Sequence, residues 1–179
     1  MRSFDVYMSD WEKVLLDKAV ERLSQDVYWR NRLEGWGEGR PLGFAWHLAI
    51  FVEPFLSYVL DGTKAVESRF SINRAEPYKR VGPKDILLLK TSGGPIVGAA
   101  EVSEVTFYQL NADELERIRE RFGEALRVED EEFWTDRKDS CYASIIGISH
   151  VTPFPPLDCD KRDKRGWVRL QYQPTLLFG

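Results

Sequence analysis

The chain has 179 residues, of which 43% are hydrophobic and 13% aromatic, and this apolar content is enough for one well-packed domain. No apolar run approaches the roughly 18 to 20 residues that span a bilayer, and the N-terminus lacks the basic and apolar regions of a signal peptide. Cys141 and Cys159 stand apart, without the spacing of metal ligands or of a disulfide framework. We therefore expect a cytoplasmic protein with no membrane segment, bound metal or cofactor.

The net charge of −4 is unevenly distributed along the chain. Residues 64–90 hold seven Lys/Arg against three acids, and residues 161–169 hold five against one, so each segment carries +4. The rest of the chain carries −12. The net negative charge of the whole protein repels nucleic acid. The two basic segments nevertheless form a local binding patch if the fold brings them together. The alternative is ordinary segregation of surface charge.

The N-terminal segment has the pattern of an amphipathic helix. Ser9 and Glu12 have the spacing of a capping box, and apolar residues then recur every four positions from Trp11 to Val27. We expect a helix reaching about Leu33, followed by a glycine-rich loop. This predicts an N-terminal helical extension over residues 1–42, packed on a main domain over residues 43–179. A helix that binds a protein partner is the alternative.

The main domain begins with a strand and a short helix. Residues 44–51 are apolar around His47 and read as a buried strand. Pro54 suits the first turn of a helix whose apolar face spans residues 55–60. Gly62 suits the left-handed position that closes a helix.

The remaining elements alternate irregularly between strands and helices. We expect strands at residues 86–90, 96–107, 142–151 and 166–172, and helices from Asn111 and near residues 131–134. Together these elements predict an α+β domain whose sheet closes into a small mixed β-barrel with flanking helices.

Three charged residues follow Gly62 at fixed offsets: Lys64, Glu67 and Arg69. If a strand begins here, Glu67 and Arg69 share one face because side chains alternate along a strand. Lys64 lies nearer the turn, where the alternation need not hold, and it can swing toward the carboxylate of Glu67. We interpret this cluster as a candidate site.

The stretch from Gly62 to Arg69 resembles the G-x-K-x-x-E-x-R signature of the ASCH domain family. The resemblance continues through the following basic loop, the Gly82–Asp85 turn and the segment 98–102, and it covers roughly residues 46–171. It implies a PUA-like fold, and families that share this fold commonly bind RNA or modified bases. Members of the ASCH family are proposed to act in RNA metabolism, with the signature residues lining a cleft.

The resemblance also implies two possible activities. Some small ASCH-like proteins hydrolyse N4-acetylcytidine with the lysine of the motif and a threonine in place of its glutamate. This chain has Glu67 at that position, so the nucleophile of that reaction is missing. Other members are linked to ribonuclease activity.

The charged cluster therefore has a binding role and a catalytic alternative. Lys64 and Arg69 can bind a phosphate or a base carbonyl, while Glu67 orients one of them or accepts a hydrogen bond. A partly desolvated Lys64 can also act as a base, which would make Lys64 and Glu67 the catalytic residues of an enzyme. A structural ion pair at the helix–strand junction is the third interpretation.

Further candidate ligand-binding residues lie in three other segments. The loop after the motif interleaves basic side chains with an aromatic ring, which suits single-stranded nucleic acid. Lys90 and Ser92 end a predicted strand, and Lys164 and Arg165 precede the last strand and can supply a second wall of the cleft. In order, these residues are Ser71, Arg74, Tyr78, Lys79, Arg80, Lys90, Ser92, Lys164 and Arg165.

From these patterns we expect a protein that binds RNA, single-stranded nucleic acid or a nucleoside-like small molecule in a basic cleft. The alternative is an enzyme on the same cleft, either a metal-independent ribonuclease or a hydrolase of a modified nucleoside. A protein-interaction adaptor that uses the N-terminal helix is a third class.

Overall fold

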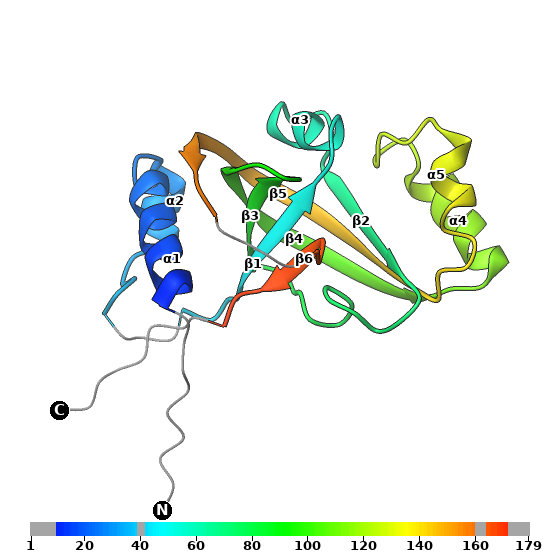
Figure 1. Cartoon of the computed structure of the whole chain (residues 1–179), viewed down its shortest axis with the longest axis horizontal. Helices are drawn as coiled ribbons and strands as arrows, with labels where there is room; N and C mark the ends of the chain where they lie inside the picture. Colours follow the sequence, from blue (N-terminus) through cyan, green and yellow to red (C-terminus); the bar gives the residue numbers. More distant parts are fainter. Residues whose placement is uncertain (1–9, 39–41, 160–163, 172–179) are drawn as a thin grey trace, which may run out of the picture.

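A six-stranded mixed sheet organises the chain, with helices at both ends of the molecule (Figure 1). The computed structural model describes residues 10–38, 42–159 and 164–171. The helices are α1 (Asp10–Leu23), α2 (Val27–Arg32), α3 (Phe55–Leu60), α4 (Ala112–Phe122) and α5 (Glu131–Thr135). The strands are β1 (Trp46–Phe51), β2 (Val66–Ser71), β3 (Ile86–Thr91), β4 (Ile96–Gln109), β5 (Tyr142–Leu157) and β6 (Trp167–Arg169). The predicted α+β fold is confirmed.

The strands follow the order β2-β5-β4-β3-β1-β6. β1 and β3 pair in parallel, and the other neighbours pair antiparallel. β2 and β6 are the two edges of the sheet, which curves into a mixed half-barrel flanked by helices. This confirms the predicted small mixed β-barrel fold, and side chains rather than backbone pairs span the opening between its edges.

Strands β4 and β5 are long and bend as they pair. Their register shifts between Ile96 and Gly98, between Ala99 and Glu101, and between Val102 and Glu104. Such bulges bend a strand and increase its twist. Gly98 lies at one of them, where a Cβ atom would come within 2.8 Å of the Thr152 carbonyl oxygen. Only glycine permits this close approach, so the bend depends on it.

The N-terminal segment forms two helices, where the sequence predicted one. The break falls at residues 24–26, and the side chain of Asp26 caps α2 by accepting a hydrogen bond from the Trp29 amide. The predicted capping residue Ser9 lies outside the described residues.

The two N-terminal helices pack on the sheet, as expected. Leu16, Leu23 and Trp29 are fully buried in one apolar cluster with Trp46 and Leu48 of β1. Polar contacts reinforce this packing, because Tyr28 and Arg32 of α2 both donate hydrogen bonds of 2.8 Å to Glu101 of β4. The division into an extension over residues 1–42 and a domain over residues 43–179 stays a prediction.

A second apolar cluster holds α4 and α5 against β5 at the opposite end of the molecule. Asn111 caps α4 by accepting a hydrogen bond from the Glu114 amide, as predicted. Ile118 of α4 and Trp134 of α5 are buried in this cluster, together with Ile145 of β5. Within the described residues, no helix is both long and apolar enough to cross a membrane.

Candidate functional site

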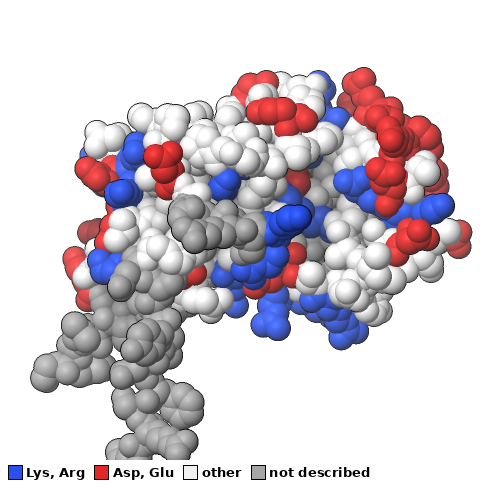
Figure 2. All heavy atoms as spheres, viewed as in Figure 1, with Lys and Arg blue, Asp and Glu red and all other residues white. Residues whose placement is uncertain are grey.

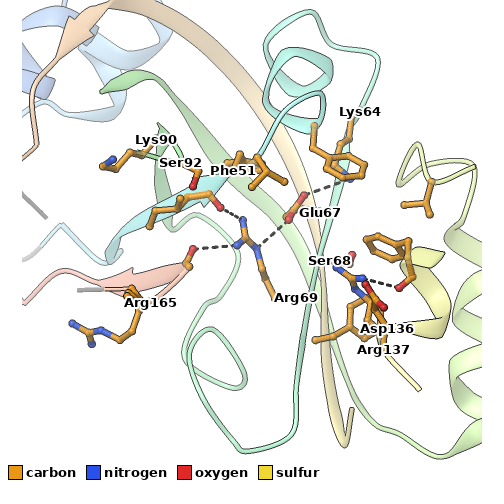
Figure 3. A pocket seen from close by; sticks show the side chains of 18 of the residues that line it. Phe51, Lys64, Glu67, Ser68, Arg69, Lys90, Ser92, Asp136, Arg137 and Arg165 are labelled. Carbon is orange, nitrogen blue, oxygen red and sulfur yellow. Dashed lines mark hydrogen bonds and ion pairs between the residues drawn. The ribbon is translucent and has the colours of Figure 1, made fainter. Parts of the chain in front are cut away.

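A cavity of about 900 Å³ is lined by β2, by the end of β1, by the segment before β6 and by residues of the α5 region (Figure 3). Residues from the motif, from both basic segments and from the α5 region line it together. The principal ones are Phe51, Phe55, Lys64, Glu67, Ser68, Arg69, Phe70, Lys90, Ser92, Phe133, Asp136, Arg137, Lys164 and Arg165. The fold therefore brings the two basic segments together at one cavity.

The three charged motif residues meet at the centre of this cavity. Glu67 of β2 places one carboxylate oxygen 3.0 Å from Arg69 Nε and the other 3.4 Å from Lys64 Nζ. Glu67 and Arg69 share a face of the strand, as the alternation predicted. Lys64 precedes β2 and turns toward the carboxylate, also as expected. Figure 3 shows the three side chains converging from one strand and its preceding turn.

Lys64 is the most buried of the three charged residues, with 2% of its surface exposed. Its Nζ donates a hydrogen bond of 2.8 Å to the Leu126 carbonyl oxygen and lies 5.3 Å from the centre of the Phe55 ring. Burial lowers the pKa of Lys64 below its ordinary value, and the carboxylate of Glu67 opposes this shift. A fraction of the amine is therefore neutral at a lower pH than in a solvent-exposed lysine.

Arg69 spans the opening of the half-barrel. Its guanidinium donates one hydrogen bond of 2.9 Å to the Ile50 carbonyl oxygen of β1 and another of 3.1 Å to the Gly166 carbonyl oxygen just before β6. It also lies 5.1 Å from the centre of the Phe51 ring and 5.3 Å from that of Trp167. Only arginine presents several donors in one rigid fork, so this bridge depends on the residue type.

A buried hydrogen-bond chain fixes Trp167 under this bridge. The indole Nε1 of Trp167 donates to His47 Nδ1 at 3.0 Å, and His47 Nε2 lies 3.0 Å from Asp85 Oδ2. An indole nitrogen can only donate, so Nδ1 of His47 carries no proton and its Nε2–H donates to Asp85. Both ring nitrogens of His47 are thus engaged inside the core, in agreement with the expectation that it belongs to the core.

The other end of the cavity carries the predicted basic residues Lys90, Lys164 and Arg165, with Ser92 beside them. Lys90 is buried, and its Nζ donates to the carbonyl oxygens of Thr91 and Gly94. It thereby holds the turn after β3 in place. Lys164 and Arg165 are exposed and come from the segment before β6, which supplies the expected second wall.

The predicted loop residues lie outside the cavity lining. Tyr78 is only 6% exposed and packs against Phe107 and Tyr142, so its ring does not offer a surface for base stacking. The expectation that Tyr78 stacks on a ligand is not supported, because the ring is used by the core. The other predicted residues of this segment also lie outside the cavity. Ser71 pairs with β5, and Arg74, Lys79 and Arg80 are exposed on the loop.

The sequence reasoning missed the contribution of the α5 region. Phe133 and Arg137 line the cavity opposite the motif, and the guanidinium of Arg137 lies 3.4 Å from the centre of the Phe133 ring. Arg137 also donates a hydrogen bond of 2.6 Å to the Phe133 carbonyl oxygen. No local pattern marks these residues as part of a site, because they reach it only through the packing of α4 and α5 on β5.

Among the described residues, no group of three or more His, Cys, Asp or Glu side chains is placed to bind a metal ion. Paired charges, hydrogen-bond donors and aromatic faces line the cavity.

Solved structures with the same fold were found by comparison. An ASCH protein from Zymomonas mobilis matches with a TM-score of 0.56 and 12% sequence identity, over 71% of this chain and 88% of the other. The ASCH domain from Lactobacillus crispatus matches with a TM-score of 0.50 and 11% identity, over 84% of this chain and 99% of the other. This chain has the ASCH fold. The resemblance read from the motif is thus confirmed at the level of the fold.

Comparisons by sequence add no further relative. No family model matches the chain, and no curated protein matches it either. The three-dimensional matches therefore carry the ASCH fold of this chain, in agreement with the motif Gly62–Arg69 and its flanking segments.

Proposed function

We propose that this ASCH-fold protein binds RNA or a nucleotide-like ligand in the cavity around Lys64, Glu67 and Arg69. The observation that carries the proposal is the convergence of two distant basic segments on one aromatic-lined cavity in a protein of net charge −4. The cavity volume of about 900 Å³ lies within the range of small-molecule and cofactor sites. The ASCH resemblance, which implies a role in RNA metabolism, supports the same ligand class.

The residues of the cavity suit the parts of a nucleotide. Exposed Lys164 and Arg165 attract phosphate oxygens. Phe133 and Phe55 offer aromatic faces near the centre, with ring centroids 6.3 Å apart. Glu67 accepts hydrogen bonds, and a carboxylate has more acceptor positions than its two ion pairs use. A nucleotide thus finds complementary groups for its charged and its aromatic parts.

Direct binding measurements test this proposal. Fluorescently labelled single-stranded RNA is titrated with the protein at several salt concentrations, because phosphate contacts make affinity fall with salt. We expect Arg165→Ala to weaken RNA binding. It should also reduce, by about one, the slope of the logarithm of the binding constant against the logarithm of the salt concentration. Lys18→Ala serves as the matched control, because Lys18 is an exposed basic residue on α1, away from the cavity. Absence of binding to RNA and to mononucleotides at low salt would contradict the proposal.

The second candidate function is catalysis in the same cavity, and the buried Lys64 favours it. A lysine with a lowered pKa that lines a cavity is a possible general base. The reaction would be metal-independent RNA cleavage or hydrolysis of a modified nucleoside, with Lys64 as base and Glu67 holding it. Glu67 replaces the threonine nucleophile of the acetylcytidine hydrolases, so a water molecule would have to attack instead.

An activity assay in the presence of a chelator separates this candidate from simple binding. RNA and N4-acetylcytidine are each incubated with the wild-type protein and with the Lys64→Met variant. Enzymatic function predicts product with the wild type only, while both proteins keep the same circular dichroism spectrum. If the wild type leaves both substrates intact but binds RNA, the protein is a binding module.

A further inference from the structure

The cavity has two chemically different ends. In Figure 3, Lys90, Ser92 and Arg165 lie at one end, Glu67 and Arg69 lie between, and Lys64, Asp136 and Arg137 lie toward the other. We propose that the cavity takes one terminal nucleotide unit, with its phosphate at the end of Lys164 and Arg165 and its base at the end of Phe133. This inference rests on the proposed function and specifies its ligand: a nucleoside monophosphate, either free or at the end of an RNA chain.

The charges that line the cavity indicate which end binds the phosphate. Lys90, Lys164 and Arg165 gather there, and the acids among the described lining residues are Glu67 and Asp136, which lie away from this end. Gly93 and Gly94 complete this wall and place no side chain in front of the backbone. An anionic group is therefore favoured at this end by charge and by space.

The choice of the base end rests on its lower positive charge and on its aromatic surface. The cations Lys64, Arg69 and Arg137 face the carboxylates of Glu67 and Asp136, so a neutral ring meets less excess charge here than at the phosphate end. One face of Phe133 is covered by Arg137, and Phe55 packs near it in an edge-on arrangement. Aromatic and guanidinium planes of this kind are common partners of bases.

The surface beyond the base end is acidic, and this feature limits the ligand to one unit. A second hollow of about 440 Å³ shares Phe55, Phe133 and Arg137 with the main cavity, and the acids Glu129, Asp130 and Glu132 line it together with Arg127. Figure 2 shows acidic side chains gathered over α4 and α5, with basic side chains toward the middle of the same face. A strand that continued past the base end would bring its phosphates against these carboxylates, and like charges repel.

A ligand series tests the inference. The affinities of a nucleoside, its 5′-monophosphate and its 3′-monophosphate are measured by calorimetry, and RNA from dinucleotide to decanucleotide is compared with and without a terminal phosphate. We expect one monophosphate to bind at least about tenfold more tightly than the nucleoside, which corresponds to about 1.4 kcal/mol. We also expect the affinity for RNA longer than a dinucleotide to exceed the affinity for the dinucleotide by no more than about threefold.

Two double variants test the structural cause. The double variant Lys164→Ala/Arg165→Ala should bind the monophosphate no more tightly than the nucleoside. The control variant Lys18→Ala should keep the wild-type difference in affinity between these two ligands. Glu129→Gln with Glu132→Gln should strengthen binding of the decanucleotide several-fold and leave the monophosphate unchanged, because the acidic barrier is then removed.

The outcomes separate this inference from the proposed function. Affinity that climbs steadily with RNA length and ignores the terminal phosphate overturns the single-unit inference but leaves RNA binding intact. Failure of every nucleotide and RNA to bind overturns both. A terminal-phosphate preference that survives in the Lys164/Arg165 double variant overturns the assignment of the phosphate end.

Discussion

Arg69 Nη1, on edge strand β2, donates a hydrogen bond to the Gly166 carbonyl oxygen, just before the opposite edge strand β6. The two edges of the half-barrel do not pair through their backbones. Arg69 joins them instead, and its ion pair with Glu67 places the same guanidinium in the wall of the cavity. Arg69 therefore both holds the two edges of the sheet together and forms part of the candidate site.

Arg69→Lys is expected to destabilise the fold by about 2–3 kcal/mol. A lysine keeps the charge but cannot reach Glu67, Ile50 and Gly166 together, and charge-assisted hydrogen bonds contribute about 1.5–3 kcal/mol each. The free energy of unfolding in urea measures the effect, with Lys18→Ala as the control. A loss no larger than that of the control would show that the bridge does not hold the edges.

The Lys64 amine is expected to make stability rise with pH. Burial lowers the pKa of Lys64 in the folded protein below its ordinary value of 10.5. Between the folded pKa and 10.5 the unfolded chain therefore binds more protons, and the contribution of this group to stability increases with pH across that window. Below the folded pKa the contribution is constant.

The variant Lys64→Met isolates this contribution. The difference in unfolding free energy between the wild type and the variant should rise from neutral pH toward pH 10.5. Tyr28, whose pKa is raised to about 12 by burial and by its bond to Glu101, changes stability in the opposite direction but is present in both proteins. A flat or falling difference would contradict the lowered pKa.

Asp85→Asn is expected to cost about 2–4 kcal/mol at neutral pH. Burial acts to raise the pKa of Asp85, but hydrogen bonds from His47 and from the amides of Ala45 and Gly82 lower it below the ordinary value of 3.8. The carboxylate therefore stabilises the fold above about pH 4, and this stabilisation is lost as the pH falls through the lowered folded pKa. Urea unfolding at neutral pH and near pH 3 measures both values. An equal cost at the two pH values would show that the charge of Asp85 is not involved.

Deletion of residues 1–42 is expected to unfold the protein instead of simply removing a partner-binding arm. Leu16, Leu23 and Trp29 are fully buried against β1, and truncation of a buried tryptophan alone costs about 3–5 kcal/mol. Thermal unfolding followed by circular dichroism compares the truncated chain with the full chain. A cooperative transition at an unchanged midpoint would favour the alternative, an N-terminal helix that is available to bind a protein partner.

The sequence was most informative where a local pattern determined the geometry. Strand alternation after Gly62 predicted that Glu67 and Arg69 share a face, and the short distance to the turn allowed Lys64 to approach Glu67. Asn111 marked the start of α4 because its side chain caps the helix locally. Each of these predictions depended on a few neighbouring residues.

The sequence was least informative where distant packing decides. Phe133 and Arg137 join the site because α4 and α5 fold back on β5, and nothing in their own neighbourhood indicates it. Tyr78 looked like an exposed aromatic among basic residues, but Phe107 and Tyr142 bury it. The break between α1 and α2 had a local signal, Asp26 as a helix cap, which the strong four-residue periodicity obscured.

The most direct test of a nucleotide site is a map of amide chemical shifts in ¹⁵N-labelled protein as a nucleoside monophosphate is added. We expect the shifts to concentrate at the cavity, on the amides of Ser68, Gly93, Arg137 and Gly166, which come from four separate segments. Shifts confined to the basic loop around Lys79 and Arg80, or to the outer face of α4, would contradict a nucleotide site in this cavity.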